Sequence, residues 1–203
     1  QTQRSLEHFR ISTEKMPEPL IRAFQDRHGM YIQQGWGMTE TSPVGSVSKV
    51  TSELESASSD AQFAYRAKAG LPLPFVEIRA RCDDGELAPW DGETMGELEV
   101  RGPWVARSYY NAPESADRFT GDGWFRTGDI VSIDSRGCIT IQDRSKDLVK
   151  SGGEWISSVA LEGALLSHQD VAEAVVIAVP HEKWCERPVA VIVPRAGRVP
   201  TLD

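Results

Sequence analysis

The carboxylate of Glu40 lies among hydroxyl residues in a short segment with two glycines, Gly35–Pro43 (GWGMTETSP). A carboxylate beside hydroxyls in a glycine-containing loop after a strand could bind Mg²⁺ and an anionic phosphate, because hard cations prefer oxygen ligands. The alternative is an exposed loop in which a threonine caps a turn. The segment alone favours that alternative, so the metal hypothesis needs support from other parts of the chain.

A second carboxylate, Asp129, ends the segment Gly123–Asp129 (GWFRTGD). An aspartate after a glycine turn can accept two hydrogen bonds from the vicinal hydroxyls of a ribose, as the acidic residue of dinucleotide-binding folds does. The alternative is an aspartate that only forms the turn. The residue types by themselves favour the turn.

Six ionisable groups lie within the thirteen residues of Asp143–Trp155. The guanidinium of Arg144 could bind a ribose or a phosphate with two parallel hydrogen bonds. Gly152 and Gly153 permit positive φ and let a ligand approach the backbone closely. The alternative is a solvated charged hairpin, which is the ordinary role of such a charge run.

The elements that must position these residues follow from periodicity. Pro17–His28 has apolar residues on one helical face and a glycine after its end, so it predicts a helix, and Met30–Gln34 predicts a short strand. Apolar and charged residues alternate from Val76 to Arg81 and again over Glu97–Arg101, which predicts half-buried strands. Pro113–Phe119 could form a short helix.

Two strands before Arg144, Ile130–Asp134 and Cys138–Asp143, form a predicted hairpin. After Arg144 the sequence pattern changes to an alternation of strands and helices. A helix is expected to begin at Ser157 or Ser158. Two further segments are apolar and β-branched and therefore predict buried strands; they are Val171–Val179 and Val189–Val193.

Composition excludes several classes of function. The formal net charge of −8 argues against a general electrostatic grip on nucleic acid. No apolar run is long enough to span a bilayer. The three cysteines are scattered singly, which argues against a zinc site and against a disulfide framework. Single reduced thiols are typical of a reducing compartment, so we expect a cytoplasmic protein.

Four motifs in this order resemble the adenylate-forming superfamily of acyl-CoA synthetases. They are GWGMTETSP at 35–43, GELEVRG at 96–102, GWFRTGD at 123–129 and DRSKDLVKSGGEWIS at 143–157. The last motif is similar to that of medium- and long-chain fatty-acid CoA ligases and of methylmercaptopropionate-CoA ligases. The resemblance covers nearly the whole chain.

The resemblance implies an acid–thiol ligase of fatty-acid and lipid metabolism. A carboxylic acid attacks the α-phosphate of ATP, giving acyl-AMP and pyrophosphate, and the thiol of CoA then displaces AMP. ATP, Mg²⁺ and CoA are the implied cofactors and co-substrates, and a small-molecule carboxylic acid is the implied substrate.

The implied fold is mixed α/β (α+β). Residues 1–144 would be the C-terminal part of the large AMP-binding domain, ending in a β-barrel-like subdomain. Residues 145–203 would be an incomplete small α+β C-terminal domain.

The resemblance also implies roles for the first motif. Trp36 would lie against the adenine, and Gly35 and Gly37 would line the acyl and nucleotide pocket. Thr39 would bind the α-phosphate and Glu40 would bind Mg²⁺, so these two would be the catalytic residues of this chain.

Further roles fall on the later motifs. Asp129 and Arg144 would bind the ribose hydroxyls, with Ile141 near the base, and Lys146 would be the hinge between the subdomains. A rotation about that hinge would let one cleft serve both half-reactions. The residues that would line the CoA tunnel are Lys150, Ser151, Gly152, Gly153 and Trp155.

Three departures separate the chain from the family pattern. The upstream phosphate loop and the C-terminal adenylation lysine are absent, which predicts a C-terminal fragment that is inactive alone. The segment Ile11–Met16 replaces a Gly-Gly-Ser/Ala segment of the family. Two alternatives therefore stay open, namely a carrier-protein-loading adenylation domain and a non-catalytic remnant.

Overall fold

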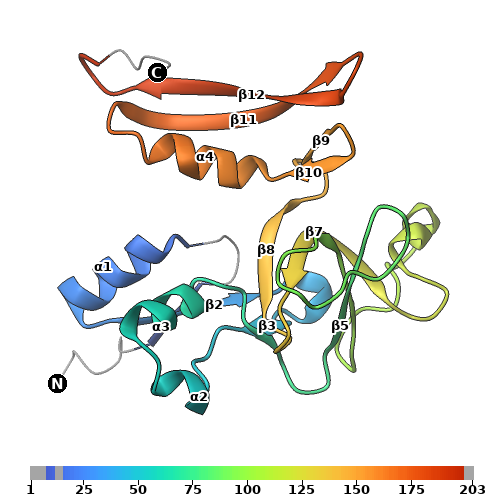
Figure 1. Cartoon of the computed structure of the whole chain (residues 1–203). Helices are drawn as coiled ribbons and strands as arrows, with labels where there is room; N and C mark the ends of the chain where they lie inside the picture. Colours follow the sequence, from blue (N-terminus) through green and yellow to red (C-terminus); the bar gives the residue numbers. More distant parts are fainter. Residues whose placement is uncertain (1–7, 12–15, 199–203) are drawn as a thin grey trace. The chain divides into compact units, whose positions relative to one another are not determined.

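The computed structural model describes residues 8–11 and 16–198 and contains three four-stranded sheets with short helices (Figure 1). The chain divides into two compact units. The first comprises residues 1–127 and 131–141, and the second comprises residues 128–130 and 142–203. The mixed α/β class expected from the sequence is confirmed, whereas the domain boundary at Arg144 stays a prediction.

The first sheet belongs to the first unit and has the strand order β1-β2-β3-β4. Its strands are β1 (His8–Ile11), β2 (Tyr31–Trp36), β3 (Ser46–Val47) and β4 (Leu71–Pro72). Helix α1 (Glu18–His28) connects β1 to β2, and these two strands are parallel. The predicted helix and the strand after it are thus confirmed. Most of the departing segment Ile11–Met16 lies outside the described residues.

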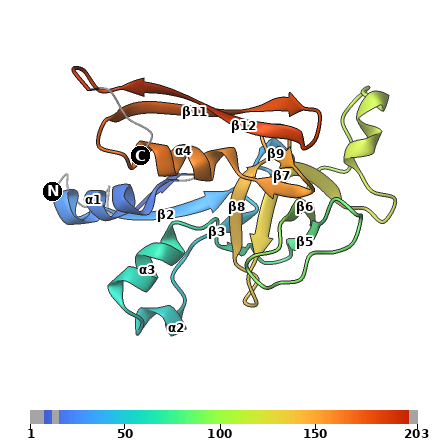
Figure 2. The same ribbon diagram turned by 45° about the horizontal axis from the view of Figure 1, so that its top comes forward.

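Helices α2 (Ser52–Glu55) and α3 (Ser59–Arg66) lie below α1 in the view of Figure 2, and α3 packs against α1. An apolar cluster forms where α1 and α3 meet β2. Its buried members include Ile21, Ile32 and Phe63, which are at most 3% exposed. This cluster fixes the strand that leads directly into the Glu40 segment.

The second sheet has the order β5-β6-β7-β8. Its strands are β5 (Glu77–Arg81), β6 (Gly96–Arg101), β7 (Phe125–Ile133) and β8 (Ile139–Arg144), with a 3-10 helix, η3 (Pro113–Arg118), before β7. The predicted alternation is confirmed, because Ile78, Ala80, Leu98 and Val100 are buried. Strands β7 and β8 each carry residues of both units.

The charged residue Glu99 of this sheet is fully buried. Glu99 has no exposed surface, and its carboxylate accepts hydrogen bonds from Arg79 at 2.5 Å and from Arg81 at 3.0 Å. A buried carboxylate is stable only when its charge is paired and its oxygens are bonded. The arginines of β5 provide both, and the strand pair is thereby held in register.

The third sheet belongs to the second unit and has the order β10-β9-β12-β11, with one helix, α4, beside it (Figure 1). Its elements are β9 (Val149–Ser151), β10 (Glu154–Ile156), α4 (Ser158–Leu166), β11 (Val171–His181) and β12 (Cys185–Pro194). Ser157 caps α4, since its hydroxyl accepts from the N–H of Ala160 at 3.1 Å. The predicted helix start is confirmed.

The prediction that β11 and β12 are buried is wrong. Val175 and Val191 pair across the two strands and are 54% and 57% exposed, and Ile177 pairs with Val189 on the same face. Side chains of a strand alternate between two faces, and Val176, on the face opposite to Val175, is buried. Among the described elements of the second unit, none buries the other face.

No helix in the described part of the chain is long and apolar enough to cross a membrane.

Candidate functional site

Asp129 and Arg144 form an ion pair within the second unit. Arg144 Nε lies 2.8 Å from Asp129 Oδ1. The preceding residue, Gly128, has φ +77° and its carbonyl accepts from the N–H of Ser145 at 2.8 Å. Two segments that are fifteen residues apart are therefore joined by a side-chain and a backbone contact, and the two predicted ribose ligands are brought together.

Lys146 lies in a hydrogen-bonded turn between β8 and β9. The backbone N–H groups of Asp147 and Leu148 both donate to the carbonyl of Arg144 at 3.0 Å, and the side chain of Lys146 is exposed. Asp143, which directly precedes Arg144, is buried. The turn is therefore held by its backbone hydrogen bonds, and the exposed side chain of Lys146 points away from its core.

Asp143 joins the end of β8 to the start of α4. Its Oδ2 accepts from the backbone N–H and the hydroxyl of Ser158, both at 2.7 Å, and its Oδ1 accepts from the N–H of Arg144 at 2.8 Å. A carboxylate at a helix N-terminus is stabilised by the free N–H groups and the helix dipole. Sequence reasoning placed Asp143 only in a charge run and missed this contact.

The β9–β10 hairpin carries the predicted CoA residues. Gly152 and Gly153 form its turn with φ +62° and +88°, as expected. The ammonium of Lys150 lies 5.3 Å from the ring centroid of Trp155, while its backbone N–H donates to Glu186 at 2.7 Å. Ser151 is buried and pairs with both Glu154 and Cys185.

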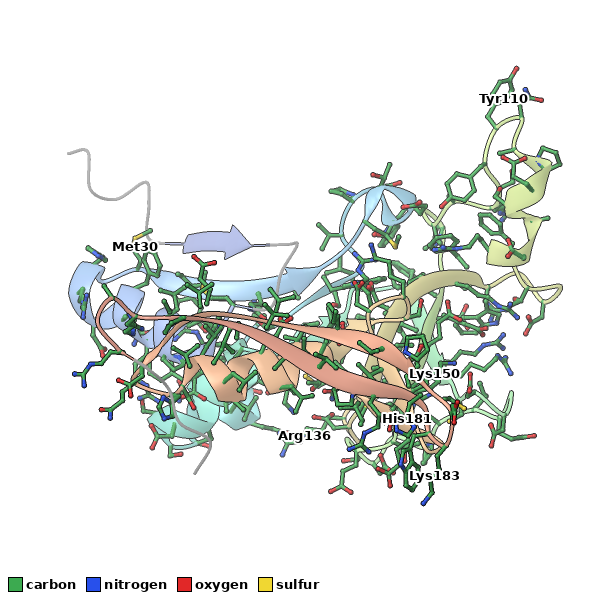
Figure 3. The ribbon with its side chains drawn as sticks, turned by 90° about the horizontal axis from the view of Figure 1, so that it is seen from above. Met30, Tyr110, Arg136, Lys150, His181 and Lys183 are labelled. Carbon is green, nitrogen blue, oxygen red and sulfur yellow. The ribbon has the colours of Figure 1, made fainter. Side chains whose placement is uncertain are left out.

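Trp184 packs directly on this turn. A Cβ added to Gly152 would meet Trp184 Cε3 at 2.8 Å, and the N–H of Gly152 donates to the carbonyl of Trp184 at 3.0 Å. Lys183 lies 4.7 Å from the Trp184 ring centroid. Figure 3 shows Lys150, His181 and Lys183 at the same end of the β11–β12 hairpin.

Glu40 lies in the first unit, in the 3-10 turn η2 (Thr39–Thr41). Thr39 is exposed and Glu40 is partly buried, but Thr41 is fully buried. The Thr41 hydroxyl accepts from the N–H of Met38 at 2.9 Å and lies 3.0 Å from the carbonyl oxygen of Pro43. The hydroxyls of this motif therefore differ in role, since Thr41 stabilises the turn and Thr39 stays accessible.

The other residues of this motif form its base. Trp36 is 4% exposed and belongs to the apolar core of the first unit, so its contact with an adenine stays a prediction. A Cβ on Gly37 would lie 1.9 Å from the carbonyl oxygen of Pro43, and one on Gly35 would lie 3.0 Å from that of Ser46. Both glycines are needed for close backbone packing. Ile141 packs at the edge of the same core.

Sequence reasoning missed Tyr109. Its hydroxyl donates to Oε1 of Glu40, and its ring packs on Phe119 with centroids 5.8 Å apart. Burial, followed by the hydrogen bond and the charge of Glu40, raises the pKa of Tyr109. The two residues are 69 positions apart, so no local pattern could indicate their contact.

The predicted site residues thus form two groups, one in each unit. Gly35, Trp36, Gly37, Thr39 and Glu40 belong to the first unit with Ile141, and the second unit holds Asp129, Arg144, Lys146 and the β9–β10 residues. Within the described ranges, no cluster of three or more His, Cys, Asp or Glu residues could by itself hold a metal ion. A cation at Glu40 would need ligands from a substrate.

Two family profiles match the chain. That of the AMP-binding enzymes matches residues 1–110, and that of the AMP-binding enzyme C-terminal domain matches residues 160–203. Among curated proteins, the chain is 47% identical over 201 residues to a long-chain-fatty-acid–CoA ligase of Thermus thermophilus, covering 98% of this chain and 37% of that protein. It is 43% identical to a 3-methylmercaptopropionyl-CoA ligase of Ruegeria pomeroyi, covering 98% and 36%.

A solved structure agrees with these similarities. The o-succinylbenzoate CoA synthetase of Bacillus subtilis, in complex with its acyl-adenylate intermediate, superposes with a TM-score of 0.76 at 31% identity, covering 95% of this chain and 37% of that one. The chain therefore spans somewhat more than a third of the length of the proteins that it matches. Since the profile of the AMP-binding enzymes matches more than half of its residues, the chain belongs to the AMP-binding enzyme family.

Proposed function

We propose that this chain is part of an acyl-CoA ligase that activates a medium- or long-chain fatty acid, or a similar carboxylic acid, with ATP. The curated relatives named above support this assignment, since one is a long-chain-fatty-acid–CoA ligase and the other is a 3-methylmercaptopropionyl-CoA ligase. Because the three scattered cysteines favour a reducing compartment, we place the reaction in the cytoplasm.

The reaction has two displacements. A carboxylate oxygen of the acid forms a bond to the α-phosphorus of ATP, and the bond from that phosphorus to the pyrophosphate oxygen breaks. The sulfur of CoA then forms a bond to the acyl carbon, AMP leaves with the electron pair of its oxygen, and the thiol proton passes to solvent. The first step makes the carboxyl oxygen part of a good leaving group.

The ribose of ATP would be held by Asp129 and Arg144. The carboxylate of Asp129 can accept from vicinal hydroxyls, and a guanidinium offers five N–H donors. This proposal rests on one observation above the others, the 2.8 Å pair of a buried aspartate with an exposed arginine. Pairing alone would also stabilise a buried carboxylate, so the feature that supports a ligand is the exposure of Arg144, which keeps donors that a ribose can reach.

The phosphates would be bound in the first unit. Thr39, whose side chain is exposed, would donate to the α-phosphate, and Glu40 would hold Mg²⁺. Mg²⁺ in nucleotide sites is typically bound by one or two carboxylates together with phosphates and water. Glu40 fits that donor set, because one of its oxygens accepts from Tyr109 while no donor among the described residues occupies the other. The ion would screen the charge of the triphosphate.

CoA would lie along the β9–β10 hairpin. The positive φ of Gly152 and Gly153 exposes backbone between Ser151 and Trp155, and Lys150 supplies a cation beside it. Lys146 would be the hinge that presents this hairpin in the second step. A conformational change of this kind lets one cleft perform two reactions in turn.

The experiment is an assay of the whole protein with ATP and a series of saturated fatty acids, with pyrophosphate release and acyl-CoA formation measured separately. Release of pyrophosphate with CoA-dependent thioester formation is the expected result. Pyrophosphate release with transfer only to a carrier protein would support the carrier-loading alternative. Absence of both activities, with correct folding, would indicate a non-catalytic remnant and contradict the proposal.

A further inference from the structure

The geometry points to Tyr109 as a positioning residue for the cation site at Glu40, an inference that rests on the proposed function. Its hydroxyl donates to Oε1 of Glu40 across 69 residues of sequence. A hydrogen bond in which the acceptor is ionised is about twice as strong as one between neutral groups. The phenol therefore holds the carboxylate in one orientation.

The ring of Tyr109 is itself held in place. It packs edge-on against Phe119 at an interplanar angle of 66°, and Phe119 packs on Phe125 with centroids 5.2 Å apart. Phe125 is 1% exposed and belongs to the core of the first unit. The orientation of the Glu40 carboxylate is thus coupled, through two aromatic rings, to the rigid sheet.

The backbone joins the same two segments. The N–H of Ala106 donates to the carbonyl of Glu40 at 2.8 Å, and the hydroxyl of Ser42 donates to the carbonyl of Trp104 at 3.0 Å. Both bonds lie on the N-terminal side of Tyr109 in the segment 104–109. The segment 104–109 therefore supports the η2 turn, and the hydroxyl of Tyr109 is the group of that segment that bonds to the carboxylate.

This arrangement has a consequence for the cation. Because Oε1 already accepts from Tyr109, the carboxylate offers its cation chiefly Oε2, which favours binding through one oxygen. Mg²⁺ requires near-octahedral geometry, whereas Ca²⁺ accepts carboxylates through both oxygens in a larger and more flexible shell. Tyr109 should therefore favour Mg²⁺ over Ca²⁺ at this site.

The test is a double-mutant cycle on equilibrium nucleotide binding. ATP affinity is measured by calorimetry at fixed Mg²⁺, and again at fixed Ca²⁺, for the whole wild-type protein and for Tyr109→Phe, Glu40→Gln and the double variant. Outer-shell partners of metal ligands are typically worth about 10- to 100-fold in metal affinity. We expect Tyr109→Phe to weaken Mg²⁺-dependent ATP binding by that factor, to weaken Ca²⁺-dependent binding less, and to have no further effect once Glu40 is glutamine.

The adjacent residue provides a matched control. Tyr110 is 99% exposed, and Figure 3 shows it at the tip of its loop, so Tyr110→Phe should leave both affinities unchanged. Phenylalanine at 109 keeps the ring contact with Phe119, and a melting curve checks that each variant is folded. If Tyr109→Phe weakened ATP binding equally in the wild-type and Glu40→Gln proteins, or did not weaken it at all, the inference would be overturned.

The two proposals fail in different ways. A wild-type protein that binds ATP with Mg²⁺ but forms no acyl-AMP from any acid would contradict the proposed function. The double-mutant cycle on ATP binding would still test the role of Tyr109. An active wild-type protein whose Mg²⁺ dependence is unaffected by Tyr109→Phe would contradict only the role of Tyr109.

Discussion

Asp129 and Arg144 are unequal partners, since the side chain of Asp129 is 3% exposed and that of Arg144 is 51% exposed. The buried carboxylate fixes the position of the pair, while the guanidinium keeps donors that a ligand can reach. A site of this kind is ordered before its ligand binds. Ligand binding then needs little reorganisation, which preserves affinity.

Asp129→Asn should weaken the use of ATP by the whole protein by about tenfold or more, because hydrogen bonds to a charged group are worth about 1.5–3 kcal/mol. The measurement is the dependence of pyrophosphate release on ATP concentration. Asp147→Asn is the matched control, since Asp147 is an exposed carboxylate of the same unit, in the turn between β8 and β9. Near-normal ATP dependence in Asp129→Asn would refute the ribose assignment.

Lys150→Ala should separate the two half-reactions. We expect acyl-AMP formation to be unchanged and thioester formation to be several-fold slower, because the lysine lies on the hairpin proposed to contact CoA. Rapid-quench measurement of acyl-AMP and acyl-CoA distinguishes the steps, and Lys49→Ala, an exposed lysine in the first unit, is the control. Equal slowing of both steps would count against a CoA role.

Gly152→Ala and Gly153→Ala should destabilise the protein to different extents. Both positions have positive φ, which costs a residue with a Cβ about 1–2 kcal/mol. Only Gly152 has a neighbour in the way, because its Cβ would lie 2.8 Å from Trp184, whereas nothing lies within 4 Å of a Cβ on Gly153. Urea unfolding should therefore give a larger loss for Gly152→Ala. Equal losses at the two positions would show that Trp184 shifts to accommodate the added Cβ and would contradict this prediction.

The thiols should differ in reactivity. Burial raises the pKa of Cys138 to about 11 from a usual value of 9.0, and the side chain has no exposed surface, whereas Cys185 is exposed. A thiol reagent at pH 8 should label Cys185 rapidly and Cys138 only after unfolding. Mass spectrometry of peptides identifies the site, and Cys185→Ser should remove the fast phase.

The same shift predicts how stability depends on pH. The pKa of Cys138 is higher in the folded state than in the unfolded state, so its contribution to stability is complete below pH 9 and is lost as the pH rises towards 11. The slope of the unfolding free energy over that range should decrease in Cys138→Ala. An unchanged slope would show that other groups account for it.

Local features of this chain were readable from its sequence. The glycine pair at 152–153 predicted a turn with positive φ, and the serines at 157–158 predicted a helix start, because each depends on neighbours within a few residues. The alternation of Val76–Arg81 likewise predicted β5. The four motifs that resemble the adenylate-forming superfamily are also local, and they correctly indicated the AMP-binding enzyme family.

Contacts between distant segments were not readable. Tyr109 and Glu40 are 69 residues apart, and Asp143 meets Ser158 only because β8 ends beside α4. The apolar runs of β11 and β12 predicted burial, but β-branched composition reports strand formation and cannot say which face has a neighbour. For the same reason, Trp36 could be placed in a motif but not assigned to a core or to a ligand.

The bonds from Asp143 to Ser158 have a consequence for the proposed hinge. Asp143 precedes Lys146 in the chain and Ser158 follows it, and all three belong to the second unit, so the two 2.7 Å contacts join the segments on either side of Lys146. A rotation about Lys146 that separated these two segments would have to break both bonds. The free energy for that step would have to come from ligand contacts made only in the rotated state. The timing of the second half-reaction would depend on a carboxylate that contacts neither ATP nor CoA.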